Sequence, residues 1–158
     1  MDYALITSLE RDPLLSERLK RLRTIPGVGP ITALTWALEI GGVSRFQSVK
    51  QAISYCGLCS AERSSADKLV RMPISKQRNK HIQQTLVEAA KLAPRYSHEL
   101  ALRYSHELAL VYERERQRGN KNRATLAVAR KMVAYMLAVE RRKQDFVLTG
   151  EFSGTAAA

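Results

Sequence analysis

The chain has 158 residues, of which 45% are hydrophobic and 26% charged, and 26 Lys and Arg against 15 Asp and Glu give it a formal net charge of +11. This composition is typical of one globular domain, and no apolar run approaches the roughly 20 residues that cross a bilayer, which argues against a membrane protein. The N-terminus does not resemble a signal peptide, so we expect a cytoplasmic protein. The basic surplus favours nucleic acid as the partner, although a solubilising surface would carry the same charge.

The first part of the chain predicts two helices joined by a glycine-rich turn. Asp12 can cap a helix that begins at Pro13, and leucines then recur at helical spacing until Ile25-Pro26-Gly27 ends it. A second helix is expected from Pro30 to the pair Gly41-Gly42, where a left-handed cap is easily formed.

A third helix is predicted from about Ser48 to Cys56, with Gly57 closing it. Cys56 and Cys59 form a C-x-x-C pair, but the sequence has no second pair to complete a structural zinc site, so we expect no metal. Cys56 fits better as a buried apolar residue at a helix end, and Cys59 as a loop thiol.

The second half of the chain predicts a loop and three further helices. Residues 58–75 show no sustained hydrophobic period and are expected to form a long basic loop. Helix returns from about Lys76 to near Pro94, and two long helices come after it, over Tyr96–Arg118 and Asn122–Lys143. We therefore predict an all-α fold, a compact multi-helix domain.

A tandem repeat lies inside the first of these long helices. The sequence RYSHELAL occurs at 95–102 and again at 103–110. Because this length overshoots two helical turns by roughly 80°, the duplication lengthens the helix by about 12 Å and rotates the residues after it about the helix axis. We interpret it as a tandem insertion that the helix tolerates.

The turn near residue 27 has the features of a phosphate-binding hairpin. Leu22–Ala33 reads LRTIPGVGPITA, in which Gly27 and Gly29 permit a sharp turn and Val28 can plug the gap between the helices. The N–H groups of the turn and of the next helix's first turn, up to Thr32, suit a phosphate oxygen. The pattern resembles the helix-hairpin-helix motif, whose contacts to the DNA backbone are independent of base sequence. A purely structural helix-to-helix turn also uses glycine and proline.

Several short segments succeed one another in a recognisable order. They are IPGVGPITA at 25–33, FQSVKQ at 46–51, YCGL at 55–58, SS at 64–65, ISK at 74–76, AA at 89–90, RG at 118–119 and AVARK at 127–131. Each segment is weak evidence alone, but the series spans most of the chain. It resembles the C-terminal domain, transposase family 20, of the IS-one-ten group of insertion-sequence transposases, also described as DEDD transposases or bridge-RNA-guided serine recombinases.

The resemblance implies a DNA-binding and strand-exchange domain that acts in DNA transposition and recombination. In that family a loop serine attacks the scissile phosphodiester and becomes linked to DNA as a phosphoserine. Alignment on Ile74-Ser75-Lys76 places this nucleophile on Ser65, with Ser64 as the alternative. Such a step conserves the energy of the phosphodiester, and nearby cations can neutralise the charge at phosphorus. The basic residues expected to contact the nucleic acid are Lys68, Arg71, Lys76, Arg78 and Lys80.

The resemblance also implies a second domain. Family members carry an N-terminal RuvC-like domain whose four acidic residues bind magnesium, and catalysis is thought to use both domains. We expect residues 1–24 to be the end of a helical connector, 25–148 the transposase domain and 149–158 a disordered tail. The chain itself is then expected to hold no cofactor and to be an incomplete enzyme. Its implied partners are DNA, a guide RNA, the RuvC-like domain and a second copy of the chain.

Three functions remain open from the sequence. The chain can be the serine-bearing half of a recombinase, or a non-catalytic helix-hairpin-helix module or remnant that holds DNA or guide RNA. It can also be a structural helical module whose helix at 96–118 pairs with another protomer. Formation of a covalent DNA adduct separates the first function from the others, and salt-dependent binding separates the second from the third.

Overall fold

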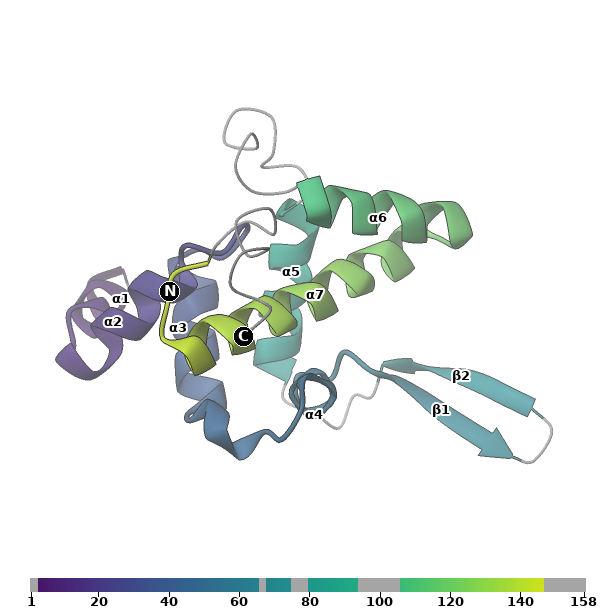
Figure 1. Ribbon diagram of the computed structural model, residues 1–158, viewed down its shortest axis with the longest axis horizontal. Coiled ribbons are helices and arrows are strands. Elements are labelled where there is room, and N and C mark those ends of the chain that lie inside the picture. Colours follow the sequence, from purple (N-terminus) through teal and green to yellow (C-terminus); the bar gives the residue numbers. More distant parts are fainter. Residues whose placement is uncertain (1–2, 66–67, 75–79, 94–105, 147–158) are drawn as a thin grey trace.

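The computed structural model describes residues 3–65, 68–74, 80–93 and 106–146, and for the two strands it describes the backbone alone. The elements in chain order are α1 (Tyr3–Glu10), α2 (Pro13–Leu22), α3 (Pro30–Ile40), the 3-10 helix η1 (Val43–Arg45), α4 (Val49–Tyr55), β1 (Ser60–Ser65), β2 (Lys68–Ile74), α5 (Lys80–Leu92), α6 (His106–Arg118) and α7 (Lys121–Arg142). The helices form one body, and the two strands extend from it as a ribbon (Figure 1). The predicted all-α fold class is confirmed, since every element that builds the core is a helix.

The helices begin where the sequence places caps. The Asp12 side chain accepts a hydrogen bond from the N–H of Leu14 at the start of α2, where proline occupies the first position as predicted. Ser48 caps α4 and Asn120 caps α7 in the same way. At the other end of α7, Lys143 adopts a left-handed conformation, which ends the helix.

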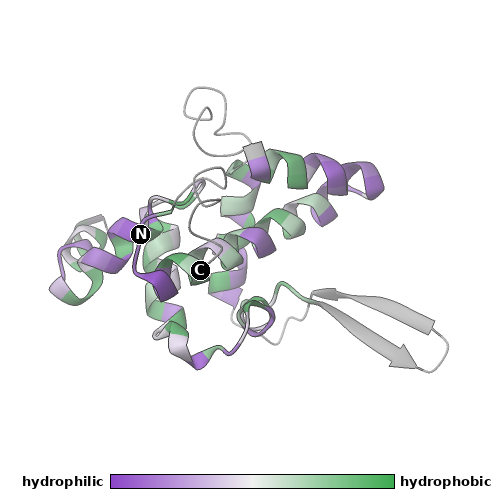
Figure 2. Ribbon diagram, viewed as in Figure 1, coloured by the Kyte–Doolittle hydropathy of each residue, from purple (hydrophilic) through white to green (hydrophobic). Residues whose placement is uncertain are grey.

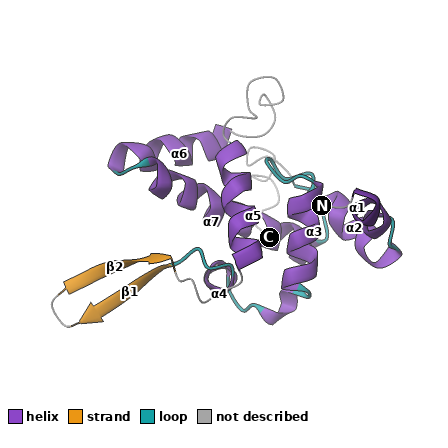
Figure 3. Ribbon diagram, turned by 180° about the vertical axis from the view of Figure 1, so that it is seen from behind, coloured by secondary structure: helices purple, strands orange, loops and turns teal. Residues whose placement is uncertain are grey.

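The segment predicted as a long basic loop contains instead a two-stranded antiparallel ribbon, β1 paired with β2 (Figure 3). The loop prediction is wrong for a physical reason. A strand reveals itself by apolar residues at alternate positions when one of its faces is buried. β1 reads SAERSS, which has no such alternation. β2 reads KLVRMPI, in which only Val70, Met72 and Ile74 alternate, and Pro73 lies among them. A ribbon that extends away from the core therefore has only a short hydrophobic signature.

Two other expectations fall partly outside the described residues. The helix predicted from about Lys76 is described from Lys80, and that predicted from Tyr96 is described from His106. The first copy of the repeat and the tail at 149–158 lie outside. In the described part of the chain, we find no helix with both the length and the apolar character required to cross a membrane.

The core is organised around α7. This helix packs against α2, α4, α5, α6 and η1, and its buried side chains include Val128, Met132 and Met136. Its apolar residues lie within the helical body, whereas the end of α6 that is farthest from the body, next to the turn into α7, is hydrophilic (Figure 2). Trp36 of α3 is the largest fully buried side chain. Because α7 is covered on several sides, it fixes the positions of the elements around it.

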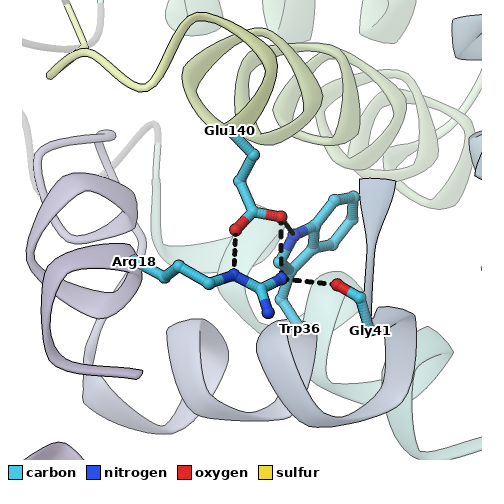
Figure 4. Close-up of polar contacts among 4 residues, drawn as sticks. All are labelled: Arg18, Trp36, Gly41 and Glu140. Atoms are coloured by element: carbon cyan, nitrogen blue, oxygen red, sulfur yellow. Dashed lines mark hydrogen bonds and ion pairs between the residues drawn. The ribbon is translucent and has the colours of Figure 1, made fainter. Parts of the chain in front are cut away.

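A buried polar cluster ties α2 and α3 to this central helix (Figure 4). The Glu140 side chain on α7 is 5% exposed, and its two oxygens accept hydrogen bonds from Arg18 Nε at 2.6 Å and Arg18 Nη2 at 3.1 Å. Trp36 Nε1 donates to Glu140 Oε2 at 2.8 Å, and Arg18 Nη2 also donates to the Gly41 carbonyl at 2.6 Å. The carboxylate is therefore paired and hydrogen-bonded, which a buried charge requires.

We predict that Arg18→Ala lowers the free energy of unfolding by about 3 kcal/mol, because it leaves the buried Glu140 carboxylate without its cation; the loss is at the lower end for a buried pair because the Arg18 side chain is 27% exposed. Chemical denaturation measures this change. Lys20→Ala is the matched control on the same helix: its ion pair with Glu17 is 3.8 Å long and both side chains are more than 70% exposed. We expect that control to change stability by less than about 0.5 kcal/mol. Equal losses in the two variants would contradict the assignment.

Candidate nucleic-acid interface

The turn between α2 and α3 contains two glycines with different structural roles. Gly27 has φ +80°, a left-handed conformation, and a Cβ added there would lie 2.6 Å from the Cβ and 3.1 Å from the Cα of Ala93. Glycine is therefore required at residue 27, where the turn passes against the end of α5. A Cβ added at Gly29 would have no atom within 4 Å. Position 29 is open to solvent, and packing does not require glycine there.

Two neighbours of these glycines face the core. Val28 is 6% exposed and belongs to the hydrophobic core, which agrees with its predicted role as a plug between the helices. Thr32 is 8% exposed. Thr32 nevertheless contributes to the lining of the groove beside the turn.

The first turn of α3 presents unsatisfied donors. Gly29 is the N-cap residue, and no side chain caps the helix. The hydrogen bonds found within the described residues leave the N–H groups of Gly29, Ile31 and Thr32 without an acceptor. Such groups at a helix N-terminus, together with the helix dipole, favour an anion.

The turn forms one wall of a groove of about 760 Å³, and α5 forms the other. Much of this groove is apolar, and Ile31 and Leu92 on its walls are 42% and 49% exposed. Arg23, the arginine that lines this groove, is already ion-paired, because its Nη1 lies 3.5 Å from Glu10 Oε1. Capacity for anion binding is thus concentrated in the backbone of the turn.

The ribbon places the two candidate serines on opposite faces. Its register pairs Ser65 with Lys68, next to the turn that joins the strands, and Ser64 with Leu69. Opposed residues of an antiparallel pair share a face and successive residues alternate. The face that carries Ser65 also carries Lys68 and, two positions back, Arg63. This face has two cations, whereas the other pairs an acidic residue with a basic one, Glu62 with Arg71.

The remaining predicted contacts are placed as follows. Arg71 lies in β2, and Lys80 is the exposed first residue of α5. Lys76 and Arg78 lie outside the described residues. The predicted site thus falls into two groups at opposite ends of α5, because Gly27 meets its C-terminal end and the ribbon precedes its N-terminal end. A helix of 13 residues is about 20 Å long.

Sequence analysis missed the residues that anchor the ribbon. Gln83 Nε2 donates to the Gly57 carbonyl at 2.8 Å, and Arg130 Nε donates to the Leu58 carbonyl at 2.8 Å. Both contacts join positions far apart in the sequence, 26 and 72 residues respectively. No local pattern signals such pairs. They hold the segment just before β1 against α5 and α7.

Cys56 and Cys59 are both free cysteines in the described structure. Cys56 is fully buried as predicted, and burial raises the pKa of its thiol to about 12. The reactive thiolate is therefore absent at neutral pH. In the portion of the chain that the structure covers, His, Cys, Asp and Glu residues nowhere gather in a group of three that could hold a metal ion.

Comparisons with known proteins all match transposases. The sequence model of the Transposase IS116/IS110/IS902 family matches residues 19–105. The chain is 30% identical over 131 residues to the transposase for insertion sequence element IS1111A of Coxiella burnetii, an alignment that covers 83% of this chain and 35% of that protein. It is 41% identical over 69 residues to the putative transposase y4qE of Sinorhizobium fredii, covering 44% and 18%.

A further relative is the transposase for insertion sequence element IS1328 of Yersinia enterocolitica, which is 34% identical over 76 residues, covering 48% of this chain and 23% of that protein. The alignments thus span between 18% and 35% of these three relatives. Properties of the whole relatives, such as activity or partners, therefore do not transfer directly to this chain.

We predict that Gly27→Ala lowers the free energy of unfolding by about 2–4 kcal/mol, through backbone strain and overpacking against Ala93, whereas Gly29→Ala costs only about 0.5–1 kcal/mol, because alanine is a poorer N-cap than glycine. Denaturant titration measures both. A double-mutant cycle localises the clash: adding Ala93→Gly should cost less in the Gly27→Ala background than in the unaltered chain. Additive losses would show that Gly27 and Ala93 do not conflict.

Proposed function

This chain belongs to the Transposase IS116/IS110/IS902 family, and on that premise we propose that it holds DNA by the phosphodiester backbone and presents a serine for strand exchange. The observation that carries the proposal is the α2–α3 turn. Its open position at Gly29 lies beside N–H groups that have no acceptor among the described residues, in a chain of net charge +11.

The turn is proposed to act as a helix-hairpin-helix. The N–H groups of Gly29, Ile31 and Thr32 would donate to phosphate oxygens, and the dipole of α3 would add to the attraction. Contacts of this kind do not read bases. Binding is therefore expected to be weakly selective for sequence and to fall steeply with salt.

The ribbon is proposed to present the nucleophile. Ser65 Oγ would form a bond to phosphorus, the bond from phosphorus to one sugar oxygen would break, and that oxygen would take up the proton that serine gives up. A phosphodiester replaces a phosphodiester, so a second sugar hydroxyl can reverse the step and rejoin a strand. Lys68 and Arg63, which share the Ser65 face of the ribbon, would stabilise charge on the transferring phosphate.

The chemistry is proposed to need a partner domain. Magnesium, expected from the family's RuvC-like domain, fits no carboxylate cluster among the described residues of this chain. The two roles proposed for this chain, holding the backbone and supplying the hydroxyl, use only its own residues. The RuvC-like domain and a guide RNA are the partners that the family resemblance suggests.

A non-catalytic binding module is the second candidate, and one observation favours it. The turn and the ribbon lie at opposite ends of α5, so contacts at the turn do not depend on the serine. A chain that binds DNA without chemistry would use the same turn.

We predict that Gly29→Asp weakens binding of a labelled duplex at least tenfold in fluorescence anisotropy while the melting temperature stays the same or rises. Aspartate caps a helix better than glycine by a few tenths of a kcal/mol, but its charge repels a phosphate at the same donors. Gly29→Asn is the matched control, since it has the same shape and no charge, and it should lose clearly less affinity. Equal binding by the Asp and Asn variants would refute anion binding at this turn.

We also predict that Ser65→Ala abolishes strand exchange when the chain is combined with a RuvC-like domain and magnesium, while its DNA affinity stays within about twofold, because one hydroxyl adds little to a contact made of many charges. A protease-sensitive covalent DNA adduct is the readout. Ser64→Ala is the control and should retain the adduct. Loss of the adduct in Ser64→Ala alone would identify Ser64 as the nucleophile. Adduct formation by both variants would rule out the serine mechanism.

A further inference from the structure

A second groove, of about 1120 Å³, lies between α4, α6 and α7 and shares no lining residue with the groove beside the α2–α3 turn. We propose that it is a second binding site for the phosphodiester backbone of DNA. The proposal rests on the proposed function in that the ligand is DNA, but it does not rest on the turn. We call this site the α4–α6–α7 groove.

Charge is the first argument. The lining cations come from three helices: Lys50 of α4, Arg114 of α6, and Arg123, Arg130 and Lys131 of α7. Against these five cations, Glu115 is the one acidic residue among the lining residues that the structure describes. A concave surface with such an imbalance concentrates a polyanion.

Two of the arginines are held in place by partners inside the protein. Arg130 Nε donates to the Leu58 carbonyl at 2.8 Å, and Arg123 Nε donates to Glu115 Oε2 at 3.1 Å. A guanidinium has five N–H donors, so one such bond fixes its position and leaves the others for a phosphate. Lys131 Nζ lies 3.0 Å from Glu107 Oε1. Lys50 and Arg114 are more exposed: the Arg114 side chain is 62% exposed, and its Nε is 3.9 Å from Glu115 Oε1.

The uncharged part of the lining indicates which part of a nucleic acid would be contacted. Its aliphatic part is Ile53, Val111, Leu126, Ala127 and Ala134, and its polar part is Ser54, Cys59, Asn120 and Asn122. Among the described residues that line it, none is aromatic, so the groove offers no ring on which a base can stack. The cations and the polar side chains of Ser54, Asn120 and Asn122 suit phosphate and sugar oxygens, and the aliphatic side chains suit the carbon faces of the sugars. An acidic peptide is the other polyanion that such a surface could attract.

The groove lies at the root of the ribbon. Cys59, the residue before β1, lines the groove, and Arg130 binds the carbonyl of the residue before that. From this root the ribbon and the α6–α7 pair extend as two arms (Figures 1 and 3). Ser65 is six residues beyond Cys59, which is about 20 Å of strand, or about six base pairs of B-DNA. A backbone held in the groove would place DNA within reach of the candidate serine.

The test compares two double variants of the full chain with equal loss of charge. Lys50→Gln with Arg114→Gln removes two groove cations, and Arg11→Gln with Lys143→Gln removes two exposed cations that line neither groove. The probe is a labelled 30-base-pair duplex, with affinity measured by anisotropy over a range of salt concentrations. A polyglutamate peptide is the second probe. Melting temperatures of both variants verify folding.

We expect the groove variant to bind the duplex about tenfold to a hundredfold more weakly at 0.1 M salt, and the slope of log K against log salt to fall by about 2. In the control variant, the affinity and the salt slope should both change much less. Equal losses in the two variants would overturn the site, because they would show that affinity depends on the total positive charge of the protein and not on the groove residues. Loss of peptide binding with DNA binding retained would overturn it in favour of a protein partner.

The experiment also separates this site from the proposed function. If the unaltered chain fails to bind the duplex, the proposed function fails and the groove site with it. If Gly29→Asp weakens binding and the groove variant does not, the function stands and the groove site is refuted. Loss of binding in the groove variant together with normal binding by Gly29→Asp would support the groove and refute the turn.

Discussion

One buried carboxylate constrains much of this fold. Glu140 is nearly inaccessible to water, and its partners Arg18 and Trp36 belong to two other helices. Hydrophobic burial alone is non-directional and allows helices to slide against one another. A charge that must be met by donors on α2 and α3 permits little sliding, since an unpaired carboxylate in the core is costly. The cluster therefore sets how the α2–α3 pair docks on α7.

That docking positions the surfaces considered for function. Once α3 is fixed on α7, the turn before it is brought against the end of α5, where Gly27 fits against Ala93. The same central helix supplies Arg130, which holds the root of the ribbon, and three cations of the α4–α6–α7 groove. The turn, the ribbon and the groove are thus all attached, directly or through α3 and α5, to the same central helix.

Helices could be predicted from the sequence because their signals are local. Pro13 and Pro30 begin helices as expected, and the glycine turn between them was apparent from its residues. The ribbon was not predicted because β1 has no apolar alternation and that of β2 is short and contains a proline. Glu140 escaped because its partners are 104 and 122 residues away. Gly27 and Gly29 looked equivalent in the sequence, and only the approach of Ala93 distinguishes them. Local chemistry is readable in a sequence, but tertiary neighbours are not.

The way the ribbon is attached gives it an evolutionary freedom that the helices lack. Its root is held through the carbonyls of Gly57 and Leu58, which are backbone atoms, so the anchoring does not depend on which side chains the strands carry. Paired insertions of two residues per strand would preserve the alternation of faces and lengthen the ribbon by about 7 Å. Homologues could thus change how far this appendage reaches, and what it carries at its tip, without repacking the core.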